Sequence, residues 1–298
     1  TETRDLIKVQ GNNFAYSFSK LTGSLTSIIF DGTELLKEGL NLNVWRAPLA
    51  NDIDNWTIWQ SGLARTPGMG AGQSNAWFAH GLDQLTTKAD RFSWTKHSEE
   101  IVVTIESHTV NADLSTAFEN RFVYTIAGSG KMTLDHTVTP CGKMPEWLPR
   151  VGVQLVLNQS FDQVKWYGRG PFETYPDRKT GAKIGTYSGS MAEQYVPYLI
   201  PQENSNKTDV RWTSLQNAQG LGVRISASEP FNFSALNVQS DNLSRAWYPF
   251  QLKPFDGVTL NLDYALSGVG CTAISTLNKY RVTPSERKFQ LVFEPFRK

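Results

Sequence analysis

The feature that most constrains the fold is a hydrophobic pattern with a period of two residues. Residues 131–138 read KMTLDHTV, so that apolar and polar side chains alternate without interruption. This period is typical of a β-strand that buries one face. The same pattern occurs in residues 101–106, 121–126, 151–157, 221–225, 259–264 and 288–293. No stretch of a dozen residues shows the period of about 3.6 that marks an amphipathic helix, which predicts an all-β fold.

The residues between these segments favour antiparallel pairing. Ala127–Gly130 is predicted to form a hairpin turn, because glycine adopts the positive φ that tight turns need. Thr22–Gly23 and Asp31–Gly32 punctuate a meander near the start of the chain. Many antiparallel strands imply two large sheets packed face to face, with alternate apolar side chains in the core. Short helical turns are expected only at Met191–Gln194 and Arg245–Trp247.

Two stretches are predicted to be long loops. Residues 51–77 include the glycine-rich sequence PGMGAG at 67–72, a composition typical of a mobile cover. Residues 168–212 contain prolines at positions 171, 176, 197 and 201, which fix φ and remove backbone N–H donors. No shift in composition marks a domain boundary, so the whole chain, 1–298, is expected to be one domain.

Composition argues against several classes of protein. The 298 residues include 29 Lys and Arg against 28 Asp and Glu, and no basic run predicts binding to nucleic acid or to an anionic membrane. No apolar run reaches the roughly 18 residues of a membrane span. The four histidines lack the spacing of a metal site, so no metal or cofactor is expected in this chain. His108 and His136 lie in strand-like segments and are expected to be structural.

The cysteines and the N-terminus bear on disulfide formation and on whether the chain is part of a longer protein. Cys141 and Cys271 are far apart in sequence and are expected to be small buried thiols rather than a disulfide. The N-terminus, TETRD, is polar and has neither an initiator Met nor the apolar core of a signal peptide. Together with the family resemblance given below, this end predicts a piece excised from a longer protein. The native compartment cannot be read from it; the protein is expected to be soluble, from the cytoplasm or the periplasm.

The richest functional pattern runs from Trp166 to Trp212. It contains WYGRGP at 166–171, YPDR at 175–178, YLIPQEN at 198–204 and DVRW at 209–212. Aromatic faces pack against the C–H faces of sugars, and planar charged groups hydrogen-bond to sugar hydroxyls. The residues that could line such a concave surface are Arg169, Glu173, Asp177, Arg178, Glu203, Arg211 and Trp212. The alternative is that these arginines and acids form structural ion pairs.

The acids of this segment are poor candidates for glycosidase catalysis. Glu173, Asp177, Glu203 and Asp209 lie near cations in the sequence, and a nearby cation favours the ionised form over a proton donor. A glycosidase also needs two carboxyl groups about 5–5.5 Å apart for retention, or farther apart for inversion. We therefore expect no catalytic residue in this chain.

The same segment resembles the C-terminal, or small-chain, domain of the β-galactosidases of glycoside hydrolase family two. Further blocks strengthen the resemblance: GSLTS at 23–27 with DGTELL at 31–36, and WRAPLAND at 45–52. A weaker block combines LNLDY at 260–264 with GVG at 268–270. The blocks extend over nearly the whole chain. The resemblance implies a β-supersandwich, the architecture shared with galactose mutarotase.

The resemblance also implies where the chemistry lies. In this family the two catalytic glutamates belong to a central (β/α)8 barrel, and this chain shows no alternating strand–helix pattern. The fragment alone is thus expected to be inactive, to complete the aglycone side of the active site and to aid assembly. Its partners would be the upstream barrel of the same chain and a galactoside. The parent is expected to be a homo-oligomer that uses a divalent and a monovalent cation.

Individual residues near the sugar follow from the resemblance. The segment after the Arg-Ala-Pro block forms a mobile loop beside the pocket, which carries over to Asn51 and Asp52, with Asp54 and Trp56 beyond them. The alternative for Asn51 and Asp52 is that they cap a turn. Arg46 is expected to anchor this loop through an ion pair.

Two departures from the family pattern affect the aglycone side. Thr259, in a predicted turn at 257–259, stands where a well-studied member has a tryptophan that stacks on the glucose-side subsite. Cys271 follows Gly270 where family members continue toward an Asn/Asp-Ser-Trp segment. A Thr offers no aromatic platform, so the resemblance leaves open a natural galactoside other than lactose.

Other functional classes stay open at this point. A stand-alone carbohydrate-binding module would use tryptophans in loops, for which the candidates are Trp56, Trp59 and Trp212. The tryptophans expected in the core or at sheet edges are Trp94, Trp147 and Trp166. An aldose 1-epimerase of the mutarotase type would need a His and a Glu on one concave face. A purely structural domain is the remaining alternative.

Overall fold

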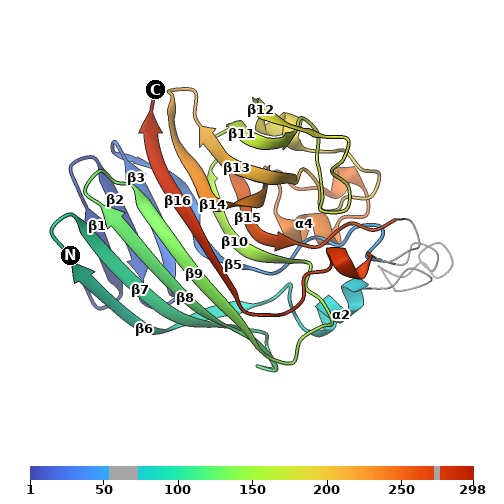
Figure 1. Cartoon of the computed structure of the whole chain (residues 1–298), viewed down its shortest axis with the longest axis horizontal. Coiled ribbons are helices and arrows are strands. Elements are labelled where there is room, and N and C mark those ends of the chain that lie inside the picture. The colour runs from blue at the N-terminus through green and yellow to red at the C-terminus, as the bar shows by residue number, and fades with distance from the viewer. Residues whose placement is uncertain (54–72, 272–275) are drawn as a thin grey trace.

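The computed structural model describes residues 1–53, 73–271 and 276–298, most of which lie in β-strands (Figure 1). The first strands are β1 (Leu6–Gln10), β2 (Phe14–Ser19), β3 (Ser24–Phe30), β4 (Thr33–Glu34) and β5 (Leu36–Asn43). The next are β6 (Thr86–Lys96), β7 (Glu100–Val110), β8 (Thr116–Ala127), β9 (Met132–Gly142), β10 (Arg150–Asn158) and β11 (Gln163–Gly170). The last are β12 (Lys183–Ser190), β13 (Lys207–Gln216), β14 (Leu221–Leu236), β15 (Gly257–Leu266) and β16 (Arg287–Arg297).

Short helices interrupt the strands. The α-helices are α2 (Gln73–Ala79), α3 (Met191–Gln194) and α4 (Ser240–Arg245), and the 3-10 helices are η1 (Pro249–Gln251) and η2 (Asn278–Tyr280). None of the helices in the described part of the chain is long and apolar enough to cross a membrane.

One strand order links the sheet: β1-β2-β3-β5-β10-β15-β14-β16-β9-β8-β7-β6. The neighbours on this path pair antiparallel. A branch of β13, β11 and β12 extends from β14, and β4 pairs with β3. The β3–β5 connection consists of the single pair Leu25–Leu40, so the first strands can turn sharply away from the rest.

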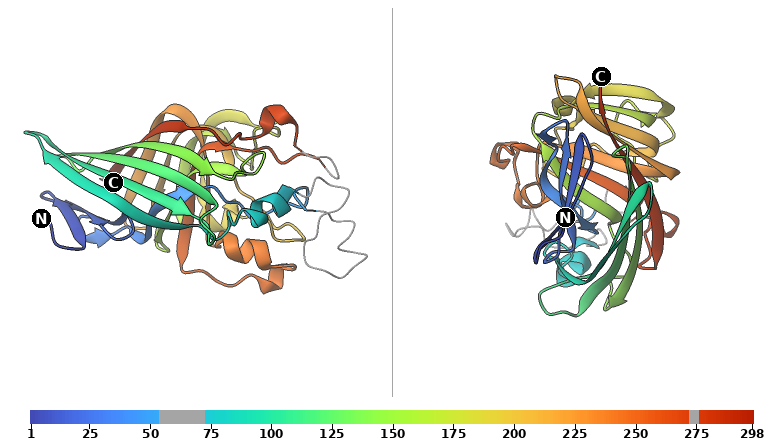
Figure 2. Two further views of the ribbon diagram at one scale, coloured as in Figure 1. Left: turned by 90° about the horizontal axis from the view of Figure 1, so that it is seen from below. Right: turned by 90° about the vertical axis from the view of Figure 1, so that its left-hand side faces the viewer.

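The two ends of this strand order fold over each other and form a sandwich. Figure 2 shows the N-terminal strands lying opposite the layer that contains β7, β8 and β9. Between the layers, the Tyr16 hydroxyl donates to the Gly130 carbonyl at 2.6 Å, and the Phe18 and Tyr124 ring centroids lie 4.9 Å apart. Burial of each such apolar side chain is worth about 1.5–3 kcal/mol. The predicted all-β antiparallel sandwich is confirmed.

The local predictions of strands and turns are largely confirmed. Every segment that alternates with a period of two lies in one of the strands β7, β8, β9, β10, β14, β15 and β16, apart from Lys131 just before β9. The hairpin between β8 and β9 has φ +86° at Gly130, a conformation that glycine adopts without strain. The turn between β3 and β4 likewise places Asp31 and Gly32 at positive φ.

The predicted loop at residues 51–77 is wrong at its C-terminal end, where α2 begins at Gln73. Trp77 on this helix is fully buried, with the ring centroids of Trp45 and Trp147 6.5 and 5.0 Å away. A helix of seven residues is too short to display a helical period, and burial of one tryptophan stabilises it. The glycine-rich sequence at 67–72 lies outside the described residues.

The predicted loop at residues 168–212 is also partly wrong. It contains β12, α3 and the start of β13. β12 pairs only with β11 and buries none of its residues, so it needs no apolar alternation and gave no strand signal. The helical turn at Met191–Gln194 is confirmed as α3, whereas α4 ends at Arg245, where the second helical turn was expected to begin.

The predictions for the histidines and cysteines are only partly confirmed. His136 is buried, accepts a hydrogen bond from the Tyr264 hydroxyl at 2.8 Å and donates to Asn120 Oδ1 at 3.1 Å, a structural role. His108 is exposed. Both cysteines are free thiols, but Cys271 is exposed and Cys141 only half-buried. The expectation of two buried thiols is wrong, because Cys271 lies in the surface segment that follows β15.

We predict that lowering the pH from 7 to 5 destabilises the protein by about 2 kcal/mol more than it destabilises His136→Gln. Burial lowers the pKa of His136 to about 3, from an unfolded value of 6.5. Between those values the unfolded chain binds a proton that the folded chain does not, so acid favours unfolding. Urea unfolding at both pH values measures the difference. Equal pH dependence in the two proteins would contradict this account.

Candidate functional site

Several predicted site residues meet at one end of the sandwich, where the segments after β5 and β15 come together. These segments are residues 44–53 and 267–271, and we call them the paired edge segments. The helices α2 and η2 lie at the same end of the molecule (Figure 1). The sequence block WRAPLAND occupies most of the first segment, and GVG occupies most of the second.

Arg46 joins the two paired edge segments through a fully buried guanidinium group. Nη2 donates to both carboxylate oxygens of Asp52 at 3.1 Å, and Nε donates to one of them at 3.3 Å. The group also donates to the carbonyl oxygens of Ser267 and Gly268, at 2.8 and 3.0 Å. A buried charge is tolerated only when it is paired and its donors are satisfied. Arg46 therefore holds both segments in one arrangement.

Asn51 and Asp177 fix the second segment from either side. Asn51 Nδ2 donates to the Val269 carbonyl at 2.9 Å. The Asp177 carboxylate accepts the backbone N–H groups of Val269 and Gly270 at 2.9 and 2.8 Å. A Cβ atom on Gly268 would lie 2.5 Å from Asp177, so only glycine fits this approach. The fold thus brings together Asn51, Asp52, Asp177 and, next in the chain, the exposed Cys271.

A second buried ion cluster lies beside the first and centres on Arg150, which was not among the predicted site residues. Its Nη2 donates to Glu203, and its Nε lies 3.6 Å from Asp263 Oδ1. The side chains are at most 3% exposed. Burial raises the pKa of Asp263 to about 7, although the attraction of Arg150 opposes the shift. A lone arginine at the start of an apolar strand carries no motif, so the sequence offered no signal for it.

The remaining acids of the 168–212 segment are also paired. Glu173 accepts hydrogen bonds from Arg178 at 2.7 Å, from the Ser205 N–H at 2.8 Å and from the Tyr198 hydroxyl. Asp209 accepts from Arg169 at 2.5 Å and from Lys179 at 2.9 Å.

Burial alone would raise the pKa of Asp209, but the hydrogen bonds from Arg169 and Lys179 outweigh burial and hold it below its usual value. The four acids of the segment thus accept hydrogen bonds from cations or backbone N–H groups. Such carboxylates suit structure and binding rather than proton donation.

Two of the predicted sugar contacts lie elsewhere in the fold than expected. Thr259 is the third residue of strand β15 rather than part of a turn, because Gly257 begins the strand. It is buried and lines a cavity together with Trp45 and Gln154. Trp212 lies in β13 rather than in a loop, and the Arg224 guanidinium stacks 4.5 Å from its ring centroid.

Trp94, Trp147, Trp166 and Arg211 have ordinary structural surroundings. Trp147 and Trp166 are buried, and Trp94 lies half-exposed on β6 with its N–H donating to Glu2 at 2.8 Å. Arg211 lies 5.7 Å from the ring centroid of Tyr167. Asp54, Trp56 and Trp59 lie outside the described residues. Within the described residues, no three His, Cys, Asp or Glu side chains are grouped so that they could hold a metal ion.

Both the sequence and the fold of this chain are similar to those of known proteins. The family profile described as beta-galactosidase small chain matches residues 10–293. The chain belongs to the β-galactosidase small-chain family. This small chain is 32% identical to a β-galactosidase of Priestia megaterium over 274 residues, which are 90% of this chain and 24% of the relative. A β-galactosidase of Vibrio cholerae is also 32% identical, over 89% of this chain and 24% of the relative.

The match therefore covers nearly all of this chain but only a part of each relative. A β-galactosidase of Kluyveromyces lactis is 28% identical over 97% of this small chain, which corresponds to 27% of that relative. The chain spans about a quarter of the length of the curated relatives that it matches. Among solved structures, a GalM/aldose epimerase homologue from C. elegans aligns with a TM-score of 0.51 at 8% identity, covering 98% of each chain. That likeness shows the galactose mutarotase-like fold alone.

We predict that Arg46→Lys destabilises the small chain by at least about 3 kcal/mol, because a lysine cannot satisfy Asp52 and two carbonyls in one plane. The matched control is Arg178→Lys, whose ion pair with Glu173 is 53% exposed on the arginine side and should cost less than about 1 kcal/mol. Urea unfolding of both variants measures the difference. Equal costs would mean that the buried cluster contributes no more than a surface pair.

Proposed function

We propose that this chain is the non-catalytic C-terminal domain of a β-galactosidase, and that it forms the aglycone side of an active site whose catalytic carboxylates lie elsewhere. The observation that carries the proposal is the pair of edge segments held by the buried Arg46. The named relatives are β-galactosidases about four times as long as the match, which supports a domain within a larger chain.

The acids of the chain support this division of labour. Asp177 has both carboxylate oxygens bonded to backbone N–H groups, and Glu203 is buried against Arg150. Neither can approach a glycosidic bond as an acid or a nucleophile. We assign those roles to a (β/α)8 barrel upstream in the same chain, with the galactoside bound between the two domains. The divalent and monovalent cations expected of the parent enzyme would belong to its other domains, as would the contacts that build a homo-oligomer.

The paired edge segments would contribute orientation rather than chemistry. A loop held in its bound conformation loses little entropy when a ligand arrives, so anchoring improves binding and positioning. Asn51 donates its amide N–H to Val269, while its amide oxygen has no hydrogen-bond partner among the described residues. That oxygen would accept a hydroxyl of the leaving sugar. Cys271 would lie on the same side.

The alternative of an aldose 1-epimerase has less support. Its acid–base pair requires a histidine that can exchange protons with a sugar. His136 is buried between Tyr264 and Asn120, and burial lowers its pKa to about 3. His108 lies on the surface beside Asp90. A stand-alone carbohydrate-binding module would not need the two edge segments to be held together by the buried Arg46.

We predict that the 298-residue protein alone does not hydrolyse a nitrophenyl galactoside, and that it restores activity when mixed with the remainder of its parent enzyme. The physical reason is that the acids of residues 168–212 are bonded to cations or backbone N–H groups, whereas the edge segments would complete a pocket that the rest of the parent forms. Absorbance of released nitrophenol measures both results. Turnover by this protein alone, abolished by a substitution within it, would refute the proposal.

We further predict that Asn51→Ala in the full-length parent lowers kcat/KM about three- to tenfold for a galactosyl disaccharide, the loss expected for one hydrogen bond. Hydrolysis of a nitrophenyl galactoside, whose leaving group carries no sugar hydroxyls, should change less than about twofold. The matched control is Asn158→Ala, which removes a similar amide-to-carbonyl bond of 2.8 Å to Glu34. Equal losses for both substrates would argue against an aglycone contact.

A further inference from the structure

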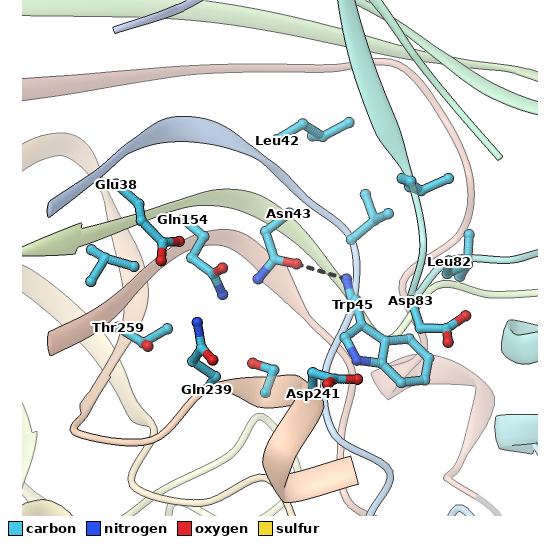
Figure 3. Close-up of a pocket in the computed structure, with 14 residues that line it drawn as sticks. Glu38, Leu42, Asn43, Trp45, Leu82, Asp83, Gln154, Gln239, Asp241 and Thr259 are labelled. Carbon is cyan, nitrogen blue, oxygen red and sulfur yellow. Dashed lines mark hydrogen bonds between the residues drawn. The ribbon is translucent and has the colours of Figure 1, made fainter. Parts of the chain in front are cut away.

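A second concave site lies on the outward face of β5, β10 and β15. It is a cavity of about 450 Å³ between these strands, the turn after α2 and the start of α4. Figure 3 shows Gln154, Thr259, Gln239 and Trp45 around it. The volume falls within the range of small-molecule sites in proteins, about 300–1,000 Å³. Of the paired edge segments, Val44 and Trp45 are the described residues that line it.

The strand register explains why this face is polar. Gln154 pairs with Asn261, and Val156 pairs with Thr259. Because side chains alternate between the faces of a sheet, the neighbours Leu155 and Leu260 point into the core instead. The sequence pattern therefore builds one apolar face for the sandwich and one face rich in amides and hydroxyls.

The amides of this face are held rigidly by one another. Asn261 Oδ1 accepts hydrogen bonds from Asn43 Nδ2 at 2.9 Å and from Gln154 Nε2 at 2.8 Å, while Asn261 Nδ2 donates to Ser234 at 3.0 Å. Asn43 Oδ1 in turn accepts the Trp45 backbone N–H at 2.9 Å. A network of this kind fixes which end of each amide faces the cavity.

Two polar atoms at this cavity have no protein partner. Thr259 Oγ1 is buried, in a side chain only 4% exposed, and makes no hydrogen bond among the described residues. The network uses Gln154 Nε2, and no described residue donates to Gln154 Oε1. Buried polar atoms are nearly always satisfied in native proteins, and Thr259 lines this cavity, so its hydroxyl is available to a partner from outside the chain.

The walls favour a hydroxyl-bearing ligand without a negative charge. Trp45 is fixed by Trp77 and Phe78, whose ring centroids lie 6.5 and 5.0 Å away, and its side chain, 7% exposed, lines part of the cavity. No Lys or Arg occurs among the described lining residues, which argues against an anion. Three acids, Glu38, Asp83 and Asp241, line the cavity, and Asp241 is paired with Arg245 at 2.7 Å. Carboxylate oxygens accept hydrogen bonds, so these acids suit a ligand that carries hydroxyl groups.

We propose that this cavity binds one hexose unit of a neutral saccharide, as a site distinct from the proposed aglycone contact at Asn51. The Thr259 hydroxyl and Gln154 Oε1 hydrogen-bond to sugar hydroxyls, and the exposed part of the Trp45 side chain contacts a C–H group of the sugar. The site is on the opposite side of β10 and β15 from the core, so in this chain it opens away from the sandwich interior. It would let the domain hold a galactoside or its sugar product apart from any catalytic barrel.

Saturation-transfer NMR on the 298-residue protein tests this site, with galactose, glucose and lactose as probes at up to about 50 mM, enough to fill a millimolar site. At least one probe should bind with a millimolar Kd. Thr259→Val and Gln154→Leu should each weaken it about three- to tenfold, as expected for one lost hydrogen bond. Thr259→Val keeps the shape of the side chain and removes an unpartnered hydroxyl, so its Tm should not fall.

The matched control is Ser107→Ala, which removes another buried hydroxyl without a hydrogen-bond partner in the described structure, on strand β7. It should leave the Kd unchanged. Absence of saturation transfer with all three sugars would overturn the proposal, as would an unchanged Kd in Thr259→Val. Equal binding of glycerol would also overturn it, since the site would then recognise any polyol. Because the assay contains no barrel, its failure would leave the proposed role of the paired edge segments untouched.

Discussion

The architecture of the functional end depends on one buried cation. Arg46 is surrounded by the Asp52 carboxylate, two backbone carbonyls and the Trp77 ring, whose centroid lies 5.4 Å from the guanidinium carbon. A guanidinium group without these partners would be very costly at this depth. Its neutralisation therefore draws together three parts of the chain that are distant in sequence: the segment after β5, the segment after β15 and helix α2.

The neighbouring Arg150 cluster also consists of buried charges that neutralise one another. The two arginines face three acids, Asp52, Glu203 and Asp263, so the group carries one excess negative charge if every acid is ionised. A proton on Asp263, whose pKa burial raises to about 7, makes the group neutral. The interior at this end of the sandwich is thus close to electrical balance, as a low-dielectric site requires.

How far the sequence predicts this molecule depends on whether a feature is local. Alternation with a period of two is local, and it identified the long strands such as β9 and β10. The edge strand β12 was not predicted, because none of its residues is buried and it therefore shows no apolar alternation. Helix α2 was not predicted, because one buried tryptophan, Trp77, stabilises it through contacts with rings distant in sequence. Thr259 was misplaced because Gly257 resembles a turn residue yet begins β15.

In the candidate site, too, local contacts could be predicted from the sequence and long-range contacts could not. The proximity of Arg46 and Asp52 follows from a separation of six residues in one motif. Arg150, by contrast, meets Glu203 and Asp263 only through the strand order, which no local pattern contains. The amide row that includes Asn261 likewise depends on cross-strand register, so it became visible only in three dimensions.

The contact between Gly268 and Asp177 has a consequence for redesign of this domain. A single added methyl group would displace a carboxylate that holds two successive amides, so a very small covalent change would loosen the whole turn. Changes that aim to alter selectivity should therefore be introduced after Gly270. Residues 267–269 should be left unchanged, because their conformation depends on this contact.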